Sequence, residues 1–426
     1  MDLLALKTHI IKKVEDAYAS KEPFAEIKLQ IIDLFEHIKY LNGGPICYIK
    51  EKGSETEKLA HGAFLMTDDI HSVNLSKSEL LFGAEKFPSK LEGKKNGYFF
   101  KPILVYSKSK KGYDTQLTVH IDYLQVHNKK TLTKFIIYLS ELLTFNNNEP
   151  DKMPVLNDVL EVPEIDEWKS KVQKVIKNID SKQKVVLSRQ KIFSYDEKIT
   201  DSCILQKIPR SPDQYLFFLK ISKSEFFISV SPEKLFSLTN NKISIDCIAG
   251  TRKRSKNSEL DKKLEQELIN SEKERSEHLF VANFIEEKMY KFCNKIVMTR
   301  AFDIMKLSKV QHLFSEFVGD LKTNENYKTI LSHLFPTPAV AGTPSNFAIE
   351  QIQKLEPNKR NYYAGACGYV SEHSTELLVG IRSIYVKENK IFVYGGAGIV
   401  ADSDYKKEWT ETEEKMKNFS FLWEQS

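Results

Sequence analysis

Two segments with helical character each carry a pair of glutamates three residues apart. The pairs are Glu274 and Glu277 in SEKERSEH, and Glu408 and Glu411 in EWTETEEK. Residues three apart lie on the same face of a helix, so two such helices could offer carboxylate oxygens to Mg²⁺, a hard cation that prefers oxygen ligands. A solvated, salt-bridged helix face has the same spacing. The spacing alone leaves both interpretations open.

Glycines gather at two places where backbone amides could approach a ligand. GGAGIV, from Gly395 to Val400, places three glycines between an expected strand and an acidic helix, and backbone N–H groups there could reach an anion. The segment matches neither the dinucleotide fingerprint nor a P-loop, and a tight structural turn would explain it equally well. IAGT, from Ile248 to Thr251, ends another expected strand in the same way.

Four charged or titratable side chains stand beside or within apolar strands. Lys184 begins KVVLSRQKIF and Glu233 follows EFFISVS, and charged residues at strand edges are usually solvated and deter aggregation. Arg382 interrupts the apolar VGIRSIYV, where a guanidinium requires a carboxylate partner or a ligand. His312 lies in a similar strand, where a hydrogen-bonded core histidine is the common alternative.

The cysteines indicate no nucleophilic or metal-binding motif. The five cysteines are widely separated and form no C-x-x-C pair, so free thiols in a reducing compartment are the simplest interpretation. The sequence contains no G-x-S-x-G elbow, so hydrolase chemistry of that type is not indicated.

Composition and charge are those of a folded protein. Of the 426 residues, 41% are apolar and 28% charged, far from the signature of disorder. The net charge is only +5 and the basic residues are interspersed with acids, which gives little support to nucleic-acid binding. The first 21 residues read as an amphipathic helix and not a signal peptide, and no apolar run approaches the ~20 residues of a membrane span. We expect a cytoplasmic protein with no nucleic-acid or membrane partner.

The elements that must position these residues are hairpins interrupted by helices. Helices are expected over residues 1–21 and about 27–38, followed mainly by strands. The polar FNNNEPDKMP, from Phe145 to Pro154, predicts a long surface loop and a soft boundary. Further on, turn residues join two hairpins, charged helices occupy about 258–293, and a last helix begins near Tyr405. Helices between antiparallel hairpins indicate an α+β architecture with stacked sheets.

Taken in order, these motifs resemble the chorismate-utilising enzyme family, which includes isochorismate, salicylate, anthranilate and aminodeoxychorismate synthases. The motifs are KVVLSR, SPEKL, IAGT, SEKERSEH, VQHLF, PTPAVAGTP, YYAGACGYV, VGIRS and YGGAGIVADSDYKKEWTETEEK, over roughly residues 165 to 420. Several motifs in the same order make chance similarity remote. The resemblance implies a single large α+β fold, like that of anthranilate synthase component I, with two stacked, mainly antiparallel sheets surrounded by helices. Residues 1–150 would be its N-terminal α/β part and residues 160–426 its chorismate-binding catalytic region.

Two positions favour isochorismate synthase within this family. Water-using members carry lysine where this chain has Lys184, whereas anthranilate synthases carry glutamine. Aminodeoxychorismate synthases carry a nucleophilic lysine where this chain has Ala249. The resemblance thus implies an isomerase in which water adds at C2 of chorismate and the C4 hydroxyl leaves, with Lys184 as general base and Glu233 as general acid. These roles require a neutral amine and a carboxyl that keeps its proton, and burial favours both.

The same resemblance implies a set of ligand-binding residues. Glu277 and Glu411 would ligate Mg²⁺, with Glu274 and Glu408 holding its waters, and the ion would bind the ring carboxylate of chorismate. A dianionic substrate among acidic residues requires such a cation. The other expected contacts are Arg382 and Lys415 with substrate carboxylates, Gly250, Thr251 and Gly396 through backbone or hydroxyl groups, and His312, Ala339 and Gly365 as pocket lining.

Two alternatives stay open at this point. The chain could be a salicylate synthase, which goes on from isochorismate to eliminate pyruvate, or a catalytically inactive chorismate-binding relative. No glutamine amidotransferase subunit is expected, and the protein would be a monomer or homodimer. Cys247 stands where the family pattern has proline before IAGT, a departure that bears on the contacts of Gly250 and Thr251. The pathway served, menaquinone or siderophore, does not follow from the sequence.

Overall fold

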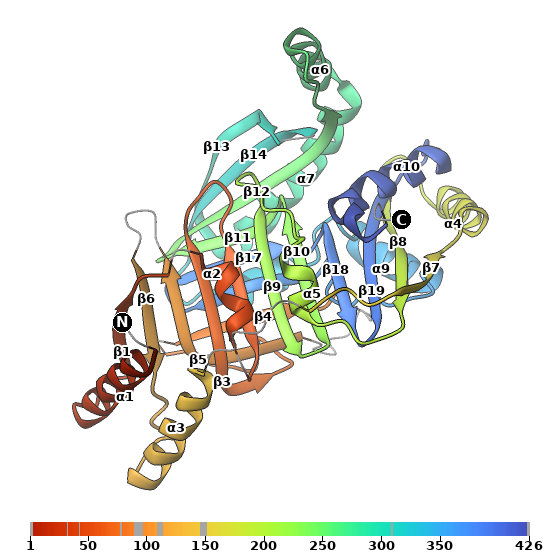
Figure 1. Cartoon of the computed structure of the whole chain (residues 1–426). Helices are drawn as coiled ribbons and strands as arrows, with labels where there is room; N and C mark the ends of the chain where they lie inside the picture. The colour runs from red at the N-terminus through yellow and green to blue at the C-terminus, as the bar shows by residue number, and fades with distance from the viewer. Residues whose placement is uncertain are drawn as a thin grey trace.

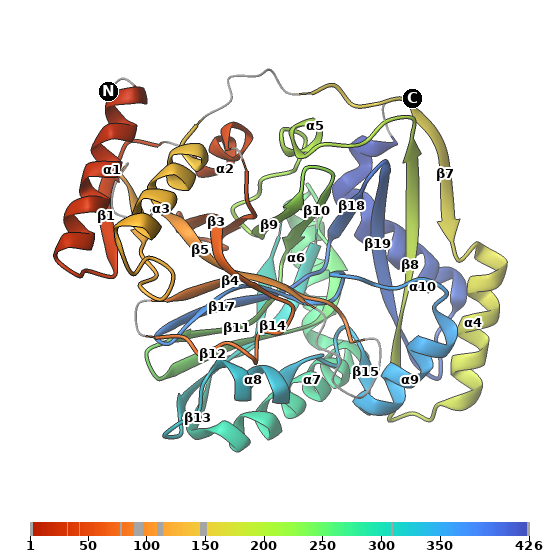
Figure 2. The same ribbon diagram turned by 90° about the horizontal axis from the view of Figure 1, so that it is seen from below.

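The computed structural model describes residues 3–31, 33–41, 43–76, 79–88, 97–108, 114–144, 151–307 and 310–423. Within these ranges, hydrogen bonds join the strands into one 19-stranded network. The network folds over itself to form two layers (Figures 1 and 2). We call these layers the long sheet and the short sheet.

The long sheet runs from the N-terminal strands to the strand that begins with Lys184. Every neighbouring pair in it is antiparallel. In spatial order the strands are β1 (Phe24–Leu29), β6 (Thr115–His120), β5 (Gly97–Lys108), β3 (Glu57–Thr67), β2 (Ile46–Lys50), β9 (Tyr215–Ser222), β10 (Glu225–Ser231), β18 (Ser383–Lys387), β19 (Lys390–Ile399), β8 (Lys184–Tyr195) and β7 (Leu156–Val162). The short strand β15 (Gly342–Thr343) pairs with the first residues of β8.

The short sheet is also antiparallel and is joined to the long sheet through β5. The first residues of β5 pair with β4, as in Phe100 opposite Phe82, whereas later residues pair with β6, as in Leu104 opposite Val119. The short sheet contains, in spatial order, β4 (Leu80–Glu85), β16 (Ala366–Ser371), β17 (Ser374–Val379), β11 (Lys234–Thr239), β12 (Lys242–Lys253), β14 (Val310–Leu321) and β13 (Cys293–Lys306). The expected two antiparallel layers are therefore present, and β5 is the strand that they share.

Two hydrophobic cores lie on opposite faces of the long sheet. Because side chains alternate along a strand, Phe217 of β9 contributes to the core between the two sheets, and its neighbour Phe218 contributes to the core on the other face. Phe227 and Phe226 of β10 divide in the same way. The long sheet is thus buried on both sides, which explains the nearly continuous apolar runs in these strands.

Helices cover the outer faces of both layers (Figure 2). On the side of the long sheet away from the short sheet lie α1 (Leu3–Ala19), α2 (Leu34–His37), α3 (Lys129–Leu142) and α5 (Asp201–Leu205). The short sheet is flanked by α6 (Ser258–Asn270), α7 (Glu272–Phe292) and α8 (Tyr327–Leu334), and α7 contacts β12, β13 and β14. Around β8 and β19 lie α4 (Ile165–Asn178), α9 (Ser345–Leu355) and α10 (Tyr405–Met416), with short 3₁₀ turns at Ile38–Tyr40 and Lys417–Leu422.

Two sequence predictions of secondary structure were wrong. The helix expected over about 27–38 is the strand β1 followed by the four-residue helix α2, because the buried residues Ala25, Ile27 and Leu29 alternate with exposed ones. The expected strand containing Arg382 is broken into β17 and β18, with Arg382 between them at a positive φ of 49°. The boundary predicted at Phe145–Pro154 lies partly outside the described residues, which resume at 151.

The remaining general expectations concern thiols and membrane spans. All five cysteines are free and buried, as the sequence indicated. No helix among the described residues combines the length and the apolar character that crossing a bilayer demands.

Candidate active site

Three glycines of GGAGIV make room for other groups along β19. A Cβ atom at Gly398 would lie 2.3 Å from Cε of Lys184, so the lysine side chain crosses the backbone at that point. A Cβ at Gly396 would lie 2.5 Å from the Tyr363 hydroxyl, and one at Gly395 would lie 2.6 Å from the Thr412 carbonyl of α10. The glycines are therefore part of a strand and serve close packing, and not the turn or anion-binding loop that the sequence suggested.

The loop of PTPAVAGTP is tied to the first residues of β8. Thr343 pairs with Lys184 through β15, and the Val186 amide donates to the Ala341 carbonyl at 3.0 Å. Arg360 donates to the carbonyls of Val340 and Val186 at 2.7 and 2.6 Å. Ala339 lies in this fixed loop, so the structure places it beside the strand that begins with Lys184.

Glu233 lies between β10 and β11 with its backbone N–H bonded to Ser231 Oγ. Burial raises the pKa of its carboxyl to about 7, and the nearby carboxylate of Asp246 adds to this shift. The cations Lys415, Lys52 and Lys184 lie close enough to act in the opposite direction. The structure thus brings Glu233 into the electrostatic neighbourhood of Lys184, and the raised pKa keeps a substantial fraction of its carboxyl protonated near neutral pH.

Two residues near Glu233 were missed by the sequence analysis. Lys52, from the turn between β2 and β3, donates to the Pro232 carbonyl at 3.2 Å, and burial lowers its pKa. Asp246 of β12 is bonded to Lys234 at 3.3 Å, and burial raises its pKa. Lys52 had no motif around it, because the first third of the chain carries little of the family pattern. Asp246 stands only two residues before IAGT and could have been found from that proximity.

Basic side chains also gather around Glu411. Lys415 of α10 donates to the Gly396 carbonyl at 2.8 Å and to Glu411 at 2.6 Å. Burial alone would raise the pKa of Glu411, but Lys415, Lys184 and Arg382 together hold it below its ordinary value. Glu411 therefore lies among cations, although 48% of its side chain is accessible. This cluster has the positive charge that an anionic ligand would require.

The end of β12 forms a polar edge next to α7. A bulge separates Ala249 from Thr251, with Gly250 between them at a φ of +83°. Thr251 Oγ1 is bonded to Nδ1 of His312 at 2.9 Å, and Nε2 of this buried histidine has no hydrogen-bond partner among the described residues. Burial lowers the pKa of His312 to about 3, helped by the nearby Arg382. The neutral ring at 312 is therefore more than a satisfied core histidine, since one nitrogen remains available to a ligand.

Gly365 occupies a buried corner near Arg382. Its carbonyl accepts from the Gly380 amide at 2.8 Å, and a Cβ at Gly365 would lie 2.0 Å from the Glu85 carbonyl. The Arg382 carbonyl in turn accepts from the Val230 amide at 3.0 Å. These backbone contacts fix the turn from which the guanidinium extends.

The four glutamates proposed as metal ligands lie on α7 and α10, and the end of β12 contacts both helices. Glu274 is paired with Arg252 at 2.6 Å and accepts from the Thr251 amide at 3.3 Å. On α10, Glu408 accepts from Ser403 at 2.8 Å. Oε1 of Glu414, on the same helix, lies 3.8 Å from Nζ of Lys253 at the end of β12. Among the described residues, no three His, Cys, Asp or Glu side chains gather as ligands of one ion. The donor atoms have the chemistry that Mg²⁺ requires, but the structure does not assemble them into a closed ligand shell.

One pocket lies away from Lys184 and Glu233. It has a volume of about 350 Å³ and is lined by Gln190, Ile192, Asn358, Lys359, Asn361, Tyr385, Lys387 and Phe392. Its β8 residues are six and eight positions beyond Lys184, which is roughly 20 and 26 Å along an extended strand. It contains none of the predicted site residues. We assign the site to the Lys184 and Glu233 region because complementary acid, base and cationic groups converge there.

Comparison with known proteins places the chain among enzymes that bind chorismate. The family model described as "Chorismate binding enzyme" matches residues 50–421. Anthranilate synthase component 1 of Saccharolobus solfataricus is 38% identical over 238 residues, which cover 55% of this chain and 56% of that protein. Isochorismate synthase MenF of Bacillus subtilis is 31% identical over 255 residues, covering 59% of this chain and 54% of that protein. The matched segments thus span about half the length of these relatives.

The fold is that of a solved relative over nearly its whole length. MenF from Escherichia coli, described as a menaquinone-specific isochorismate synthase, superposes with a TM-score of 0.83. The superposition covers 97% of this chain and 99% of that one at 20% sequence identity. The residues before 50, outside the family model, therefore also belong to the shared fold.

The raised pKa of Glu233 predicts a specific dependence of stability on pH. The folded-state pKa of about 7 lies above the ordinary value of 4.5, so this group stabilises the fold fully below about pH 4.5, and that stability is lost as the pH rises through 7. Glu233→Gln should therefore become more stable relative to the unmodified protein between pH 5 and pH 8, by at most about 3 kcal/mol. Denaturant unfolding at the two pH values measures this difference.

The control for that measurement is the same substitution at Glu372, whose side chain is 42% exposed. It should leave the pH dependence of stability unchanged. A Glu233→Gln variant with the same pH dependence as the unmodified protein would show that the carboxyl titrates normally.

Proposed function

Because the chain belongs to the chorismate-binding enzyme family, we propose that it is an isochorismate synthase, an isomerase that interconverts chorismate and isochorismate. The observation that carries this proposal is the proximity of Lys184 to Glu233, whose buried carboxyl has a pKa of about 7. An amine and a protonated acid in one site suit a reaction that takes a proton at one place and delivers one at another.

The proposed chemistry exchanges one hydroxyl for another across the ring. Lys184 accepts a proton from the water that attacks C2, the ring double bonds shift, and Glu233 gives its proton to the C4 hydroxyl, which leaves as water. One water enters and one leaves, so the product is an isomer of the substrate. Lys52 and Asp246 lie within electrostatic range of Glu233. Lys52 would stabilise the carboxylate once the proton has left, whereas Asp246 helps to keep the proton on the acid before that step.

The cationic side of the site would bind the two carboxylates of chorismate. Arg382 and Lys415 would provide the charge; the Lys415 amine is fixed by its bonds to Gly396 and Glu411, and the backbone of Arg382 is fixed by its bond to Val230. Thr251 and the unpartnered Nε2 of His312 offer hydrogen bonds to the substrate. The remaining wall would be formed by Gly250, Ala339, Gly365 and Gly396.

We also propose that Mg²⁺ binds between α7 and α10. Glu277 and Glu411 would hold the ion, and Glu274 and Glu408 would hold its waters. When bound, the ion would neutralise part of the substrate's negative charge. The supporting observation is the donor chemistry of two acidic helices that both contact the end of β12.

An anthranilate synthase is the second candidate, since such an enzyme is 38% identical over 238 residues. The distinction rests on Lys184, because the resemblance associates lysine with attack by water and glutamine with attack by ammonia. We therefore propose that the protein acts without an amidotransferase subunit. A cytoplasmic location is a separate proposal. Whether its isochorismate serves menaquinone or siderophore synthesis would be decided by the neighbouring enzymes.

Incubation of the purified protein with chorismate and Mg²⁺ should yield isochorismate, identified by chromatography with mass detection. Added ammonium should give no anthranilate, and a lactate dehydrogenase assay should detect no pyruvate. Pyruvate with salicylate would instead indicate a salicylate synthase. Lys184→Ala should lower turnover by at least 100-fold, the usual scale for a general base, and near-normal turnover in this variant would refute the role of Lys184.

Removal of divalent cations should abolish turnover, and added Mg²⁺ should restore it. A calorimetric titration of Mg²⁺ into Glu277→Gln should show at least tenfold weaker binding than in the unmodified protein, because one charged oxygen ligand is lost. Full turnover in excess EDTA would contradict the metal proposal and leave the acid and base assignments standing.

Gly398→Ala should impair turnover with little loss of stability. The new methyl group would meet Cε of Lys184 at 2.3 Å, and the flexible side chain can move away at small energetic cost, taking its amine out of position. Gly395→Ala is the contrasting variant, because its methyl group would meet the backbone of α10 at 2.6 Å and should cost about 1–3 kcal/mol. Thermal unfolding and steady-state rates separate the two effects, and normal turnover in Gly398→Ala would refute the placement of the lysine.

A further inference from the structure

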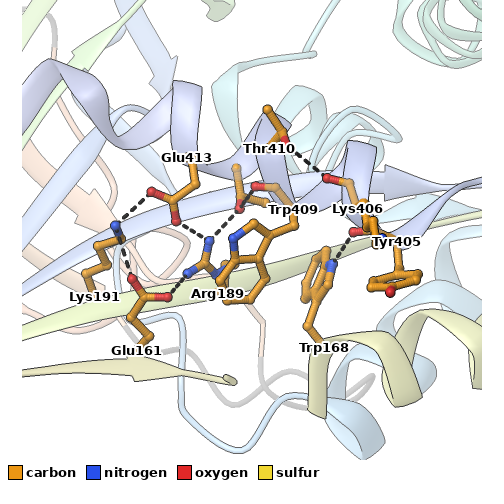
Figure 3. A network of polar contacts seen from close by, with 10 residues as sticks. Glu161, Trp168, Arg189, Lys191, Tyr405, Lys406, Trp409, Thr410 and Glu413 are labelled. Carbon is orange, nitrogen blue, oxygen red and sulfur yellow. Dashed lines mark hydrogen bonds and ion pairs between the residues drawn. The ribbon is translucent and has the colours of Figure 1, made fainter. Parts of the chain in front are cut away.

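A completely buried arginine connects the strand that begins with Lys184 to the helix that carries Lys415. Arg189 of β8 has no accessible side-chain surface, and its guanidinium carbon lies 3.1 Å from the ring centroid of Trp409 on α10 (Figure 3). Its Nη1 donates to Thr412 Oγ1 at 3.1 Å and to Glu413 on the same helix. A single side chain of β8 therefore contacts three residues of α10.

A second cation completes the network. Nη2 of Arg189 donates to Glu161 of β7 at 2.5 Å, and Lys191 is bonded to Glu413 at 2.7 Å and to Glu161 at 3.2 Å. Figure 3 shows these four side chains bridging β7, β8 and α10. The two cations and two carboxylates balance in charge, which is the condition under which a guanidinium can be buried.

The geometry of this network depends on arginine. A guanidinium presents its donors in a fixed planar fork and stacks on aromatic rings, whereas an ammonium does neither. Loss of Arg189 would leave Glu413 with Lys191 alone and would leave Trp409 without its stacking partner. The orientation of α10 would then be held by fewer and less directional contacts.

The helix face fixed by Arg189 differs from the face that points to the site. At ~100° per residue, Trp409 and Glu413 lie on one side of α10, and Glu411 and Lys415 lie on another. A small rotation of the helix about its axis would therefore move the carboxylate and the amine together. The backbone of α10 already contacts β19 at Gly395, and Gly395 pairs directly with Arg189 in the sheet.

We propose that Arg189 is a positioning residue, which with Lys191, Glu161 and Glu413 sets the rotation of α10 and so keeps Glu411 and Lys415 directed at the site. This inference rests on the proposed function where it concerns turnover. Arg189 itself contacts neither Lys184 nor Glu233, so its effect passes through the helix.

The test compares Arg189→Met with a matched control at Arg210. Arg210 also forks between two carboxylates, Asp33 and Glu36, and its guanidinium carbon also lies over an aromatic ring, 4.7 Å from the centroid of Phe35. This second fork joins the segment before β9 to the start of α2. Arg189→Met should lower kcat/KM by at least tenfold, with both a lower kcat and a higher KM, while Arg210→Met should stay within twofold of the unmodified protein.

Hydrogen exchange provides a measurement that does not require turnover. Backbone amides of α10 should exchange at least tenfold faster in Arg189→Met, whereas those of α9 should be unchanged. Arg189→Lys should recover only part of the protection, because it keeps the charge without the fork. Glu413→Gln is the milder variant if Arg189→Met does not fold, since its carboxylate is 28% exposed, and it should show the same selective effect on α10.

The outcomes separate this inference from the proposed function. Unchanged α10 exchange in the variants, or equal losses of kcat/KM in Arg189→Met and Arg210→Met, would overturn the positioning role. If the unmodified protein does not convert chorismate, the proposed function fails, and the exchange rates alone decide whether Arg189 orients the helix.

Discussion

The site depends on how closely other groups can approach the last residues of β19. Three glycines there have no side chain, and the space beside them is filled by the backbone of α10, the hydroxyl of Tyr363 and the side chain of Lys184. A methyl group at any of the three would displace one of these groups, because protein interiors have little empty volume. The absence of side chains at these positions of β19 thus allows a helix, an aromatic hydroxyl and a lysine to pack against the same strand.

Electrostatic balance is the second constraint. The pKa of Glu233 is raised to about 7 because burial outweighs the cations around it, whereas the pKa of Glu411 is lowered because the cations outweigh burial. The surroundings of the two carboxyls thus shift their pKa values in opposite directions. Burial and the neighbouring cations likewise lower the pKa of His312 to about 3 and keep its ring neutral.

The sequence predicted the hairpins and the long helices, because apolar period and turn residues are local signals. Lys184 and Glu233 were singled out from motifs, and the structure places them within electrostatic range of each other, whereas their catalytic roles stay predictions. The role of GGAGIV was not predictable from its own residues, since it depends on what packs against each glycine. Lys52 was missed for a similar reason: it comes from the first third of the chain, and only the pairing of β2 with β9 brings it to Glu233. The short strand β1 was taken for a helix because a few apolar residues satisfy both periods.

The sharing of β5 between the two layers bears on whether the chain can be divided. β2 lies against β9 and β4 lies against β16, so the first 150 residues contribute strands to the interior of both sheets. A fragment beginning near residue 160 would keep every recognisable motif and yet expose two long, apolar strand edges, which are templates for intermolecular association. The N-terminal strands β2 and β4 thus cover the edges of β9 and β16, which would otherwise be open to pairing with another chain.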